Sequence, residues 1–250
     1  MAIAVIGKRN MAVFDTVEQA AAEGVKLFLE AARDALAARG RFSVALSGGS
    51  SPVPLFRHLA EQAPRAGIDW GAVHIFWADE RCVPPDHAES NFRLADELLL
   101  SKLPARGPVI HRIAGELFPE EAASCYEADL SRSFAEDEIP VFDMIFLGIG
   151  SDGHTASLFP GMDLDRCSGR KAVAVYVEKL HSHRVTLTEP VLSRARHLVF
   201  LVTGVAKAAI VAEILGNRKG LCYPASRVAS SSAAVTWLLD AAAAGGIGHP

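Results

Sequence analysis

The sequence predicts a doubly wound α/β fold, with a mostly parallel open sheet, helices on both faces and a single domain of 250 residues. Short apolar runs alternate along the chain with segments of helical spacing. Most of these runs are continuously apolar, which is typical of strands buried on both faces of a parallel sheet. The runs expected to form strands are Phe42–Leu46, Val73–Trp77, Phe142–Leu147, Ala172–Val177 and His197–Val202.

The longest predicted helix is the alanine-rich segment Val17–Arg39, which should end at Gly40 because glycine is a favoured C-cap residue. A last helix is expected to contain Trp237, and Ala241–Pro250 is expected to be a flexible tail. No repeat or linker divides the chain, so residues 1–250 are predicted to be one domain. The remaining predicted helices are Pro52–Gln62, Asn91–Leu100, Glu120–Phe134 and Val205–Leu215.

Charge and apolar patterning narrow the classes of partner. The formal net charge is −4, and basic residues are mixed with acidic ones along the chain. No basic stripe is visible, so neither nucleic acid nor an anionic membrane is expected as the main partner. The apolar stretch Ala2–Ile6 is too short for a signal sequence, and no run of about eighteen apolar residues could span a bilayer. A cytoplasmic monomer or homodimer is expected.

The four cysteines, Cys82, Cys125, Cys167 and Cys222, lie far apart in the sequence. None belongs to a C-x-x-C pair, so the spacing indicates neither a zinc knuckle nor a thioredoxin-type redox centre. Four reduced thiols are the expected state.

The loop after the first buried strand is a candidate anion site. Gly48 and Gly49 allow a sharp turn and close approach to a ligand, and Ser50 or Ser51 is expected to cap the helix that follows. Pro52 suits the first helical turn, where a missing N–H costs nothing. Exposed N–H groups, serine hydroxyls and the helix dipole together favour phosphate. An ordinary strand-to-helix turn is the alternative, and the loop lacks the G-K-[ST] ending of a P-loop.

Three charged residues, Asp79, Glu80 and Arg81, directly follow the second buried strand. Such clusters are usually solvated surface. Here, however, the cluster follows the carboxyl end of an expected parallel strand, where doubly wound folds bind their ligands. Asp79 is suited to orienting a hydroxyl group or transferring a proton, and Arg81 is suited to binding an anion.

The loop after Phe142–Leu147 contains a G-x-G-x-x-G match at Gly148, Gly150 and Gly153. This pattern can indicate a dinucleotide site, but Asp152 would then place a carboxylate among the amides that hold the pyrophosphate. The match also lies beyond the middle of the chain. We therefore interpret the loop as a turn that presents Asp152 and His154.

His154 precedes an expected short helical turn, whose N-terminus would disfavour the protonated imidazole. A neutral imidazole is suited to act as a general base, and Asp152 is suited to fix its tautomer or to contact a substrate. The alternative is a histidine that only satisfies nearby backbone groups.

Basic residues further along the chain are candidates for binding the same anion. Arg184 precedes an expected strand, and its guanidinium can bind phosphate through two hydrogen bonds. Lys207 follows the strand His197–Val202 and could add a point charge. Both residues could equally be solvated surface. His181 and His183 suggest a metal site only weakly, since no third ligand is near in sequence.

Taken together, these segments resemble the 6-phosphogluconolactonase family. The DGHTASLFPG run is the most specific of the matches, which follow the family's order over residues 46–207. Ser51 stands where the family usually has threonine, and this exchange keeps the hydroxyl. The matching stretches are Leu46–Pro52 (LSGGSSP), Trp77–Pro84 (WADERCVP) with Ser90 and Asn91, Leu147–Gly161 (LGIGSDGHTASLFPG), Arg184–Thr188 (RVTLT) and Thr203–Lys207 (TGVAK).

The resemblance implies hydrolysis of 6-phospho-D-glucono-1,5-lactone to 6-phospho-D-gluconate, the second step of the oxidative pentose phosphate pathway. It implies no metal and no organic cofactor, and a sugar-phosphate lactone as the small-molecule partner. Carried over to this chain, it makes His154 the base that activates water, with Asp79 and Arg81 near the reacting end of the substrate. The phosphate would lie on the loop Gly48–Ser51 with Arg184 and Lys207. Whether Asp79 or Asp152 is the partner of His154 stays open.

Three rival functions are less well supported. Glucosamine-6-phosphate deaminases carry a glutamate where this chain has Phe159, which cannot transfer a proton. They also usually have Asp-Glu-Tyr in place of Asp-Glu-Arg. A sugar-phosphate-sensing domain of a transcription regulator would need a helix-turn-helix, and residues 1–40 offer a short strand and one long helix. A dehydrogenase is disfavoured by Asp152.

Overall fold

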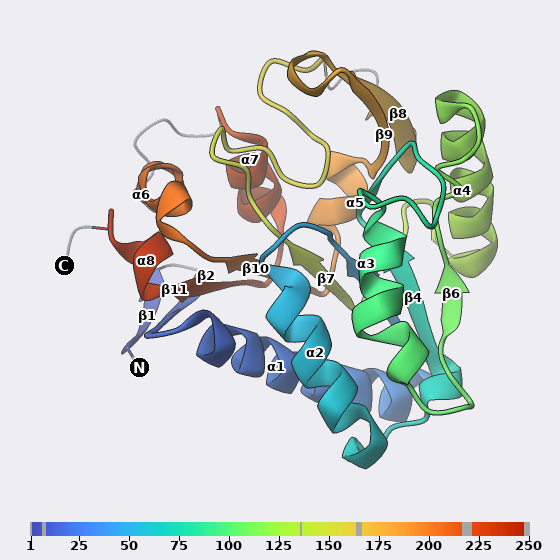
Figure 1. Cartoon of the computed structure of the whole chain (residues 1–250), viewed down its shortest axis with the longest axis horizontal. Coiled ribbons are helices and arrows are strands. Elements are labelled where there is room, and N and C mark those ends of the chain that lie inside the picture. Colours follow the sequence, from blue (N-terminus) through green and yellow to red (C-terminus); the bar gives the residue numbers. More distant parts are fainter. Residues whose placement is uncertain (1, 7–8, 136, 164–166, 217–221, 248–250) are drawn as a thin grey trace.

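An eight-stranded sheet forms the centre of the protein in the computed structural model, which describes residues 2–6, 9–135, 137–163, 167–216 and 222–247 (Figure 1). Its strands are β1 (Ala2–Ile6), β2 (Arg9–Phe14), β3 (Phe42–Leu46), β4 (Val73–Trp77), β6 (Val109–His111), β7 (Met144–Leu147), β10 (His197–Val202) and β11 (Val235–Asp240). They are arranged in the order β1-β2-β11-β10-β7-β3-β4-β6. All neighbours pair in parallel except β1 with β2. The predicted mostly parallel open sheet is confirmed.

A second, antiparallel sheet contains β5 (Asp79–Arg81), β9 (Ser182–Leu187) and β8 (Ala172–Val177). The expectation that Ala172–Val177 is a buried parallel strand of the main sheet is therefore wrong. Unlike a strand buried on both faces of a parallel sheet, this strand has an exposed side chain, that of Tyr176, whose exposed fraction is 45%. The charged triplet Asp79–Arg81, expected as a loop, instead forms an edge strand of this small sheet.

Helices cover both faces of the main sheet. In Figure 1, α1 (Val17–Arg39) and α2 (Pro52–Gln62) lie on one face, and α4 (Pro119–Ser133), α5 (Glu189–Ser193) and α7 (Pro224–Ser231) lie on the other. α1 ends where predicted, at Gly40 with a φ of 67°. Within the described ranges, no helix is long and apolar enough to cross a membrane. The remaining helices are α3 (Asn91–Leu98), α6 (Ala208–Leu215), which follows the 3₁₀ turn η6 (Val205–Lys207), and α8 (Ala241–Ala244).

The C-terminal segment differs from its prediction in two ways. Trp237 lies in strand β11, not in a helix, because Val235–Leu239, which is apolar except for Thr236, is buried on both faces of the sheet. Ala241–Ala244 forms helix α8, which Asp240 caps by accepting a hydrogen bond from Ala243 N at 2.8 Å. Ala243 is buried, so this part of the expected tail packs against the domain. Residues 248–250 lie outside the described residues.

The order of the strands determines where a ligand can bind. Starting from β3, the chain adds β4 and β6 on one side and then β7, β10 and β11 on the other. The loops after β3 and β7 therefore leave neighbouring strands at the point where the winding reverses, which is where doubly wound sheets form their binding crevice. The Ser47 hydroxyl donates to the carbonyl of Phe146 at 2.9 Å and ties these two strand ends together.

Replacing Trp237 with alanine should lower the free energy of unfolding by about 3–5 kcal/mol, since it removes a large buried side chain. The indole is fully buried and stacks on Phe200 with ring centres 4.2 Å apart. Phe118→Ala is the matched control, because Phe118 is 81% exposed and its loss should cost less than about 0.5 kcal/mol. Denaturant unfolding of both variants measures the difference, and equal losses would contradict this description of the core.

Candidate active site

The loop after β3 is shaped by its two glycines. A Cβ atom on Gly48 would lie 1.8 Å from Oδ1 of Asn91, so only glycine leaves room for that side chain. Gly49 has a φ of 90°, a conformation that favours glycine. Pro52 opens α2 and Ser51 occupies its N-cap position, as predicted, but the Ser51 side chain makes no capping hydrogen bond. Its hydroxyl instead bonds that of Thr203 at 3.0 Å, which links this loop to the one after β10.

The loops after β3, β7 and β10, together with the small sheet, surround a cavity of about 190 Å³. Nine of the ten predicted site residues line this cavity, although they come from segments far apart in the sequence. These residues are Gly48, Gly49, Ser50, Ser51, Asp79, Arg81, His154, Arg184 and Lys207. The tenth, Asp152, lies behind His154 and lines an adjacent cavity.

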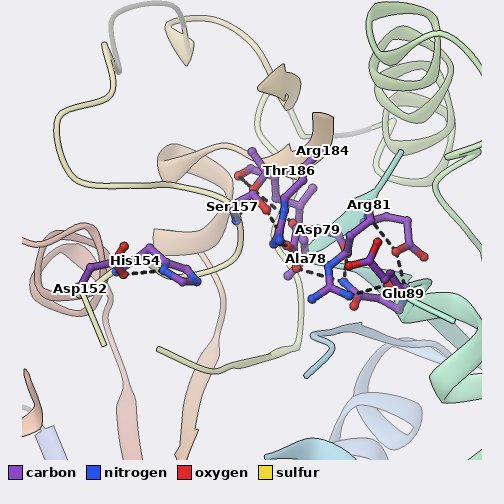
Figure 2. A network of polar contacts seen from close by, with 12 residues as sticks. Ala78, Asp79, Arg81, Glu89, Asp152, His154, Ser157, Arg184 and Thr186 are labelled. Atoms are coloured by element: carbon purple, nitrogen blue, oxygen red, sulfur yellow. Dashed lines mark hydrogen bonds and ion pairs between the residues drawn. The ribbon is translucent and has the colours of Figure 1, made fainter. Parts of the chain in front are cut away.

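His154 and Asp152 form a hydrogen-bonded pair, with 2.6 Å between Nδ1 and Oδ1 (Figure 2). Burial would raise the pKa of Asp152, but hydrogen bonds from Lys179 and His154 outweigh it and lower that pKa to about 2. The carboxylate is therefore ionised at neutral pH and can only accept, so Nδ1 carries the proton. Nε2 is left as the basic nitrogen, and no residue within the described ranges hydrogen-bonds it. Asp152, not Asp79, is thus the partner of His154.

The predicted neutral state of His154 has a different physical cause from the one expected. Burial lowers the pKa of His154 below its usual value of 6.5, and the carboxylate of Asp152 only partly opposes this shift. No helix occurs within residues 155–163, the described segment that directly follows the histidine. Residues 155–158 form a tight turn closed by a bridge between Thr155 and Leu158, so a helix dipole plays no part.

The glycines around this pair are required by close contacts. A Cβ atom on Gly150 would lie 2.0 Å from His154 Nδ1 and 2.6 Å from Asp152 Oδ1. A Cβ atom on Gly153, whose φ is 84°, would lie 2.4 Å from Tyr223. Gly150 is therefore required by the histidine–aspartate pair and Gly153 by Tyr223, whereas a Cβ atom on Gly148 would meet nothing within 4 Å. The loop is a turn that presents Asp152 and His154, as expected from the sequence.

Asp79 is almost fully buried, with 5% exposed, and is held from several sides. Its Oδ2 accepts a hydrogen bond from the Ser157 hydroxyl at 2.6 Å and lies 3.9 Å from Nη1 of Arg184 (Figure 2). Asn91 Nδ2 donates to the Asp79 carbonyl at 2.8 Å. Sequence reasoning did not select Ser157 or Asn91 for the site, although Ser90 and Asn91 were matched to the family as a pair.

Glu80 has a structural role at the same strand. Its buried carboxylate accepts hydrogen bonds from the backbone N–H groups of Asn91 at 2.7 Å and Phe92 at 2.8 Å. These N–H groups belong to the first turn of α3, where a carboxylate is stabilised by the free N–H groups. Burial raises the pKa of Glu80, and these backbone hydrogen bonds oppose the shift. Glu80 thereby fixes the start of α3 and, with it, Asn91.

The cavity wall is rich in cations. Arg81, Arg184 and Lys207 line it together with a single carboxylate, that of Asp79. Arg81 donates from Nη1 to the carbonyl of Glu89 at 2.5 Å, and Arg184 lies over the Phe159 ring at 6.0 Å. Burial lowers the pKa of Arg184, although the charge of Asp79 opposes this. The excess of positive charge suits an anionic ligand.

The described residues contain no group of three or more His, Cys, Asp or Glu side chains that could hold a metal ion. His181 and His183 therefore do not form part of such a group. His181 lies just before β9 with a φ of 45°, and His183 is exposed on the strand.

Comparison with known proteins identifies the family. The family model described as glucosamine-6-phosphate isomerases/6-phosphogluconolactonase matches residues 15–237. The chain is 41% identical to the human 6-phosphogluconolactonase, over 94% of this chain and 92% of that protein. It is 34% identical to the enzyme of the same name from a Nostoc species, over 94% and 97% of the two chains.

Solved structures agree with the sequence relatives. The structure of 6-phosphogluconolactonase from Trypanosoma cruzi superimposes with a TM-score of 0.83 at 28% identity, over 96% of this chain and 97% of that one. The Trypanosoma brucei enzyme gives a TM-score of 0.80 at 26% identity, over 94% and 97%. A monomeric glucosamine-6-phosphate deaminase, at 18% identity and a TM-score of 0.78, shares the fold. This chain belongs to the glucosamine-6-phosphate isomerase/6-phosphogluconolactonase family.

Proposed function

We propose that this protein hydrolyses 6-phospho-D-glucono-1,5-lactone to 6-phospho-D-gluconate, the second step of the oxidative pentose phosphate pathway. The observation that carries the proposal is the joint placement of an oriented, neutral imidazole and three cationic side chains around one cavity. The imidazole can activate water, and the cationic side chains can bind a phosphate. The names of the relatives support the same activity.

His154 acts as the general base. Its Nε2 accepts a proton from water as the water oxygen attacks the lactone carbonyl, and the imidazolium that forms is stabilised by Asp152. The carbonyl carbon becomes tetrahedral, and the imidazolium then returns the proton to the ring oxygen as the C–O bond breaks. No acyl-enzyme is required, since a lactone is already an activated ester.

The substrate contacts two groups of residues, which meet where Nη1 of Arg184 lies 3.9 Å from Oδ2 of Asp79. The loop Gly48–Ser51, Arg184 and Lys207 hold the phosphate, and Asp79 and Arg81 lie towards the lactone end. Two features support this division. The free N–H groups at the start of α2 favour phosphate. The buried carboxylate of Asp79 is held by the Ser157 hydroxyl and can accept a hydrogen bond from a sugar hydroxyl.

The deaminase alternative is not favoured. Phe159 stands where deaminases carry their glutamate, and its ring packs on that of His154 with centres 4.3 Å apart. An apolar ring in this contact offers no second proton-transfer group beside the histidine.

We also place the enzyme in the cytoplasm, as a monomer or homodimer. All four cysteines are free thiols, which is usual in a reducing compartment.

His154→Ala should lower kcat by about 10²–10⁴-fold with little change in KM, since it removes the base and leaves the phosphate site. In the wild-type enzyme, the acid limb of kcat/KM should have its midpoint below 6.5, because burial lowers the pKa of His154 and only the neutral ring can accept a proton. His183→Ala is the control, since this exposed side chain points to the opposite face of β9 from Arg184. Near wild-type turnover in His154→Ala would exclude the proposed base.

Gly150→Ala should reduce kcat by about 10²-fold, because the new methyl group would displace the His154–Asp152 pair and misplacement of about 1 Å has this effect. Gly107→Ala serves as a control, since its added Cβ would meet only the Pro104 carbonyl at 3.5 Å. Steady-state kinetics and thermal unfolding should be measured on both variants. If Gly150→Ala is as active as wild type, the pair does not depend on this turn.

Arg184→Ala should raise KM for the phosphorylated lactone by about tenfold to a hundredfold, the usual effect of losing a charge-assisted hydrogen bond. The same variant should convert unphosphorylated glucono-1,5-lactone about as well as wild type does. Arg194→Ala, at an exposed position beyond the opposite end of β10, is the control. Equal losses on both lactones would show that Arg184 acts at the lactone end instead.

A further inference from the structure

Lys179 contacts the catalytic pair from a segment that sequence reasoning did not select. It lies in the 3₁₀ turn η5 (Glu178–Leu180), between β8 and β9. Its Nζ forms an ion pair with Oδ2 of Asp152, while Oδ1 of the same carboxylate accepts from His154. The carboxylate is thus shared between an ammonium group on one side and an imidazole on the other.

A second contact fixes the position of Lys179. Its Nζ lies 4.8 Å from the centre of the Phe159 ring, which is cation–π distance. The same ring packs against His154 with centres 4.3 Å apart. Asp152 and Phe159 therefore both connect Lys179 to His154, one through charge and one through packing.

We propose that Lys179 is a positioning residue for the lactonase reaction: its ammonium group holds the Asp152 carboxylate in place against Nδ1 of His154 and offsets part of the negative charge of that carboxylate. This inference rests on the proposed function of His154 as a base. Lys179 does not line the cavity in which the substrate would lie, so it acts through Asp152 and not on the substrate.

The charges around His154 support this role. Asp152 from its own loop and Asp79 from β5 raise the pKa of His154, whereas Lys179 lowers it in addition to burial. Arg81, Arg184 and Lys207 face the same cavity and add positive charge. An imidazole paired with an uncompensated carboxylate would hold its proton more tightly and would be less often free to act as a base. Lys179 compensates that carboxylate.

The expected effect is modest, because the Lys179 side chain is 53% exposed and its charge is partly screened by solvent. Lys179→Met keeps a long side chain over Phe159 and removes the charge. We expect it to shift the acid limb of kcat/KM upward by about half a pH unit, with kcat on the alkaline plateau within about twofold of wild type. Lys179→Arg should restore the wild-type limb. Lys26→Met, an exposed lysine of α1 paired with Glu23, should leave it unchanged.

A second measurement does not depend on turnover. The ring-proton NMR signal of His154, identified by its loss in His154→Gln, should titrate at higher pH in Lys179→Met than in wild type. The difference should shrink at high salt, because surface charges are screened. If wild-type protein does not open the lactone, the proposed function fails, and this titration still tests the influence of Lys179 on His154.

Two results would overturn the inference. One is an unchanged acid limb together with an unchanged His154 titration in Lys179→Met. The other is a uniform fall in kcat at every pH with an unmoved titration midpoint, which would assign Lys179 a purely structural role.

Discussion

The hydrogen bond between Asp152 and Nδ1 of His154 is the interaction on which the site depends. It fixes the tautomer, directs Nε2 away from the carboxylate, and requires a glycine at position 150, since any Cβ there would occupy the same space. The bond is useful only because the ring is also buried. Burial holds the pKa of His154 down while the carboxylate stabilises the charge that forms when a proton is accepted. These opposing effects let one residue remain neutral at rest and become charged during reaction.

The architecture brings this pair to the anion-binding groups. The loops after β3 and β7 meet because their strands are neighbours at the reversal of winding, and the Ser47–Phe146 hydrogen bond joins them. The small sheet then adds Asp79, Arg81 and Arg184 from β5 and β9, which pair with each other. Residues separated by about a hundred positions thus come together through backbone pairing in two sheets, and side-chain contacts only adjust their final geometry.

Sequence reasoning succeeded where the determinants are local. α1, the glycine-rich turns and the strands β3, β4 and β10 follow from periodicity, end signals and continuous apolar runs. It failed where pairing and packing between segments distant in the sequence determine the structure. Ala172–Val177 has the composition of a core strand but pairs in the small sheet, and Trp237 stacks on Phe200 in a central strand that looked helical. Lys179 carries no local signal. Asn91 and Ser157 lie in segments that match the family, but their roles arise from partners distant in the sequence.

Position 159 shows how one side chain can redirect this scaffold. The Phe159 ring lies against His154 and beneath the charges of Lys179 and Arg184. A carboxylate in its place would be held ionised by those two cations and would raise the pKa of the neighbouring imidazole. It would also supply a second proton-transfer group. The phenylalanine has neither effect, and it leaves Asp152 as the only carboxylate hydrogen-bonded to the ring among the described residues. Attack by a single activated water needs one such base, whereas an isomerisation must move protons at more than one atom.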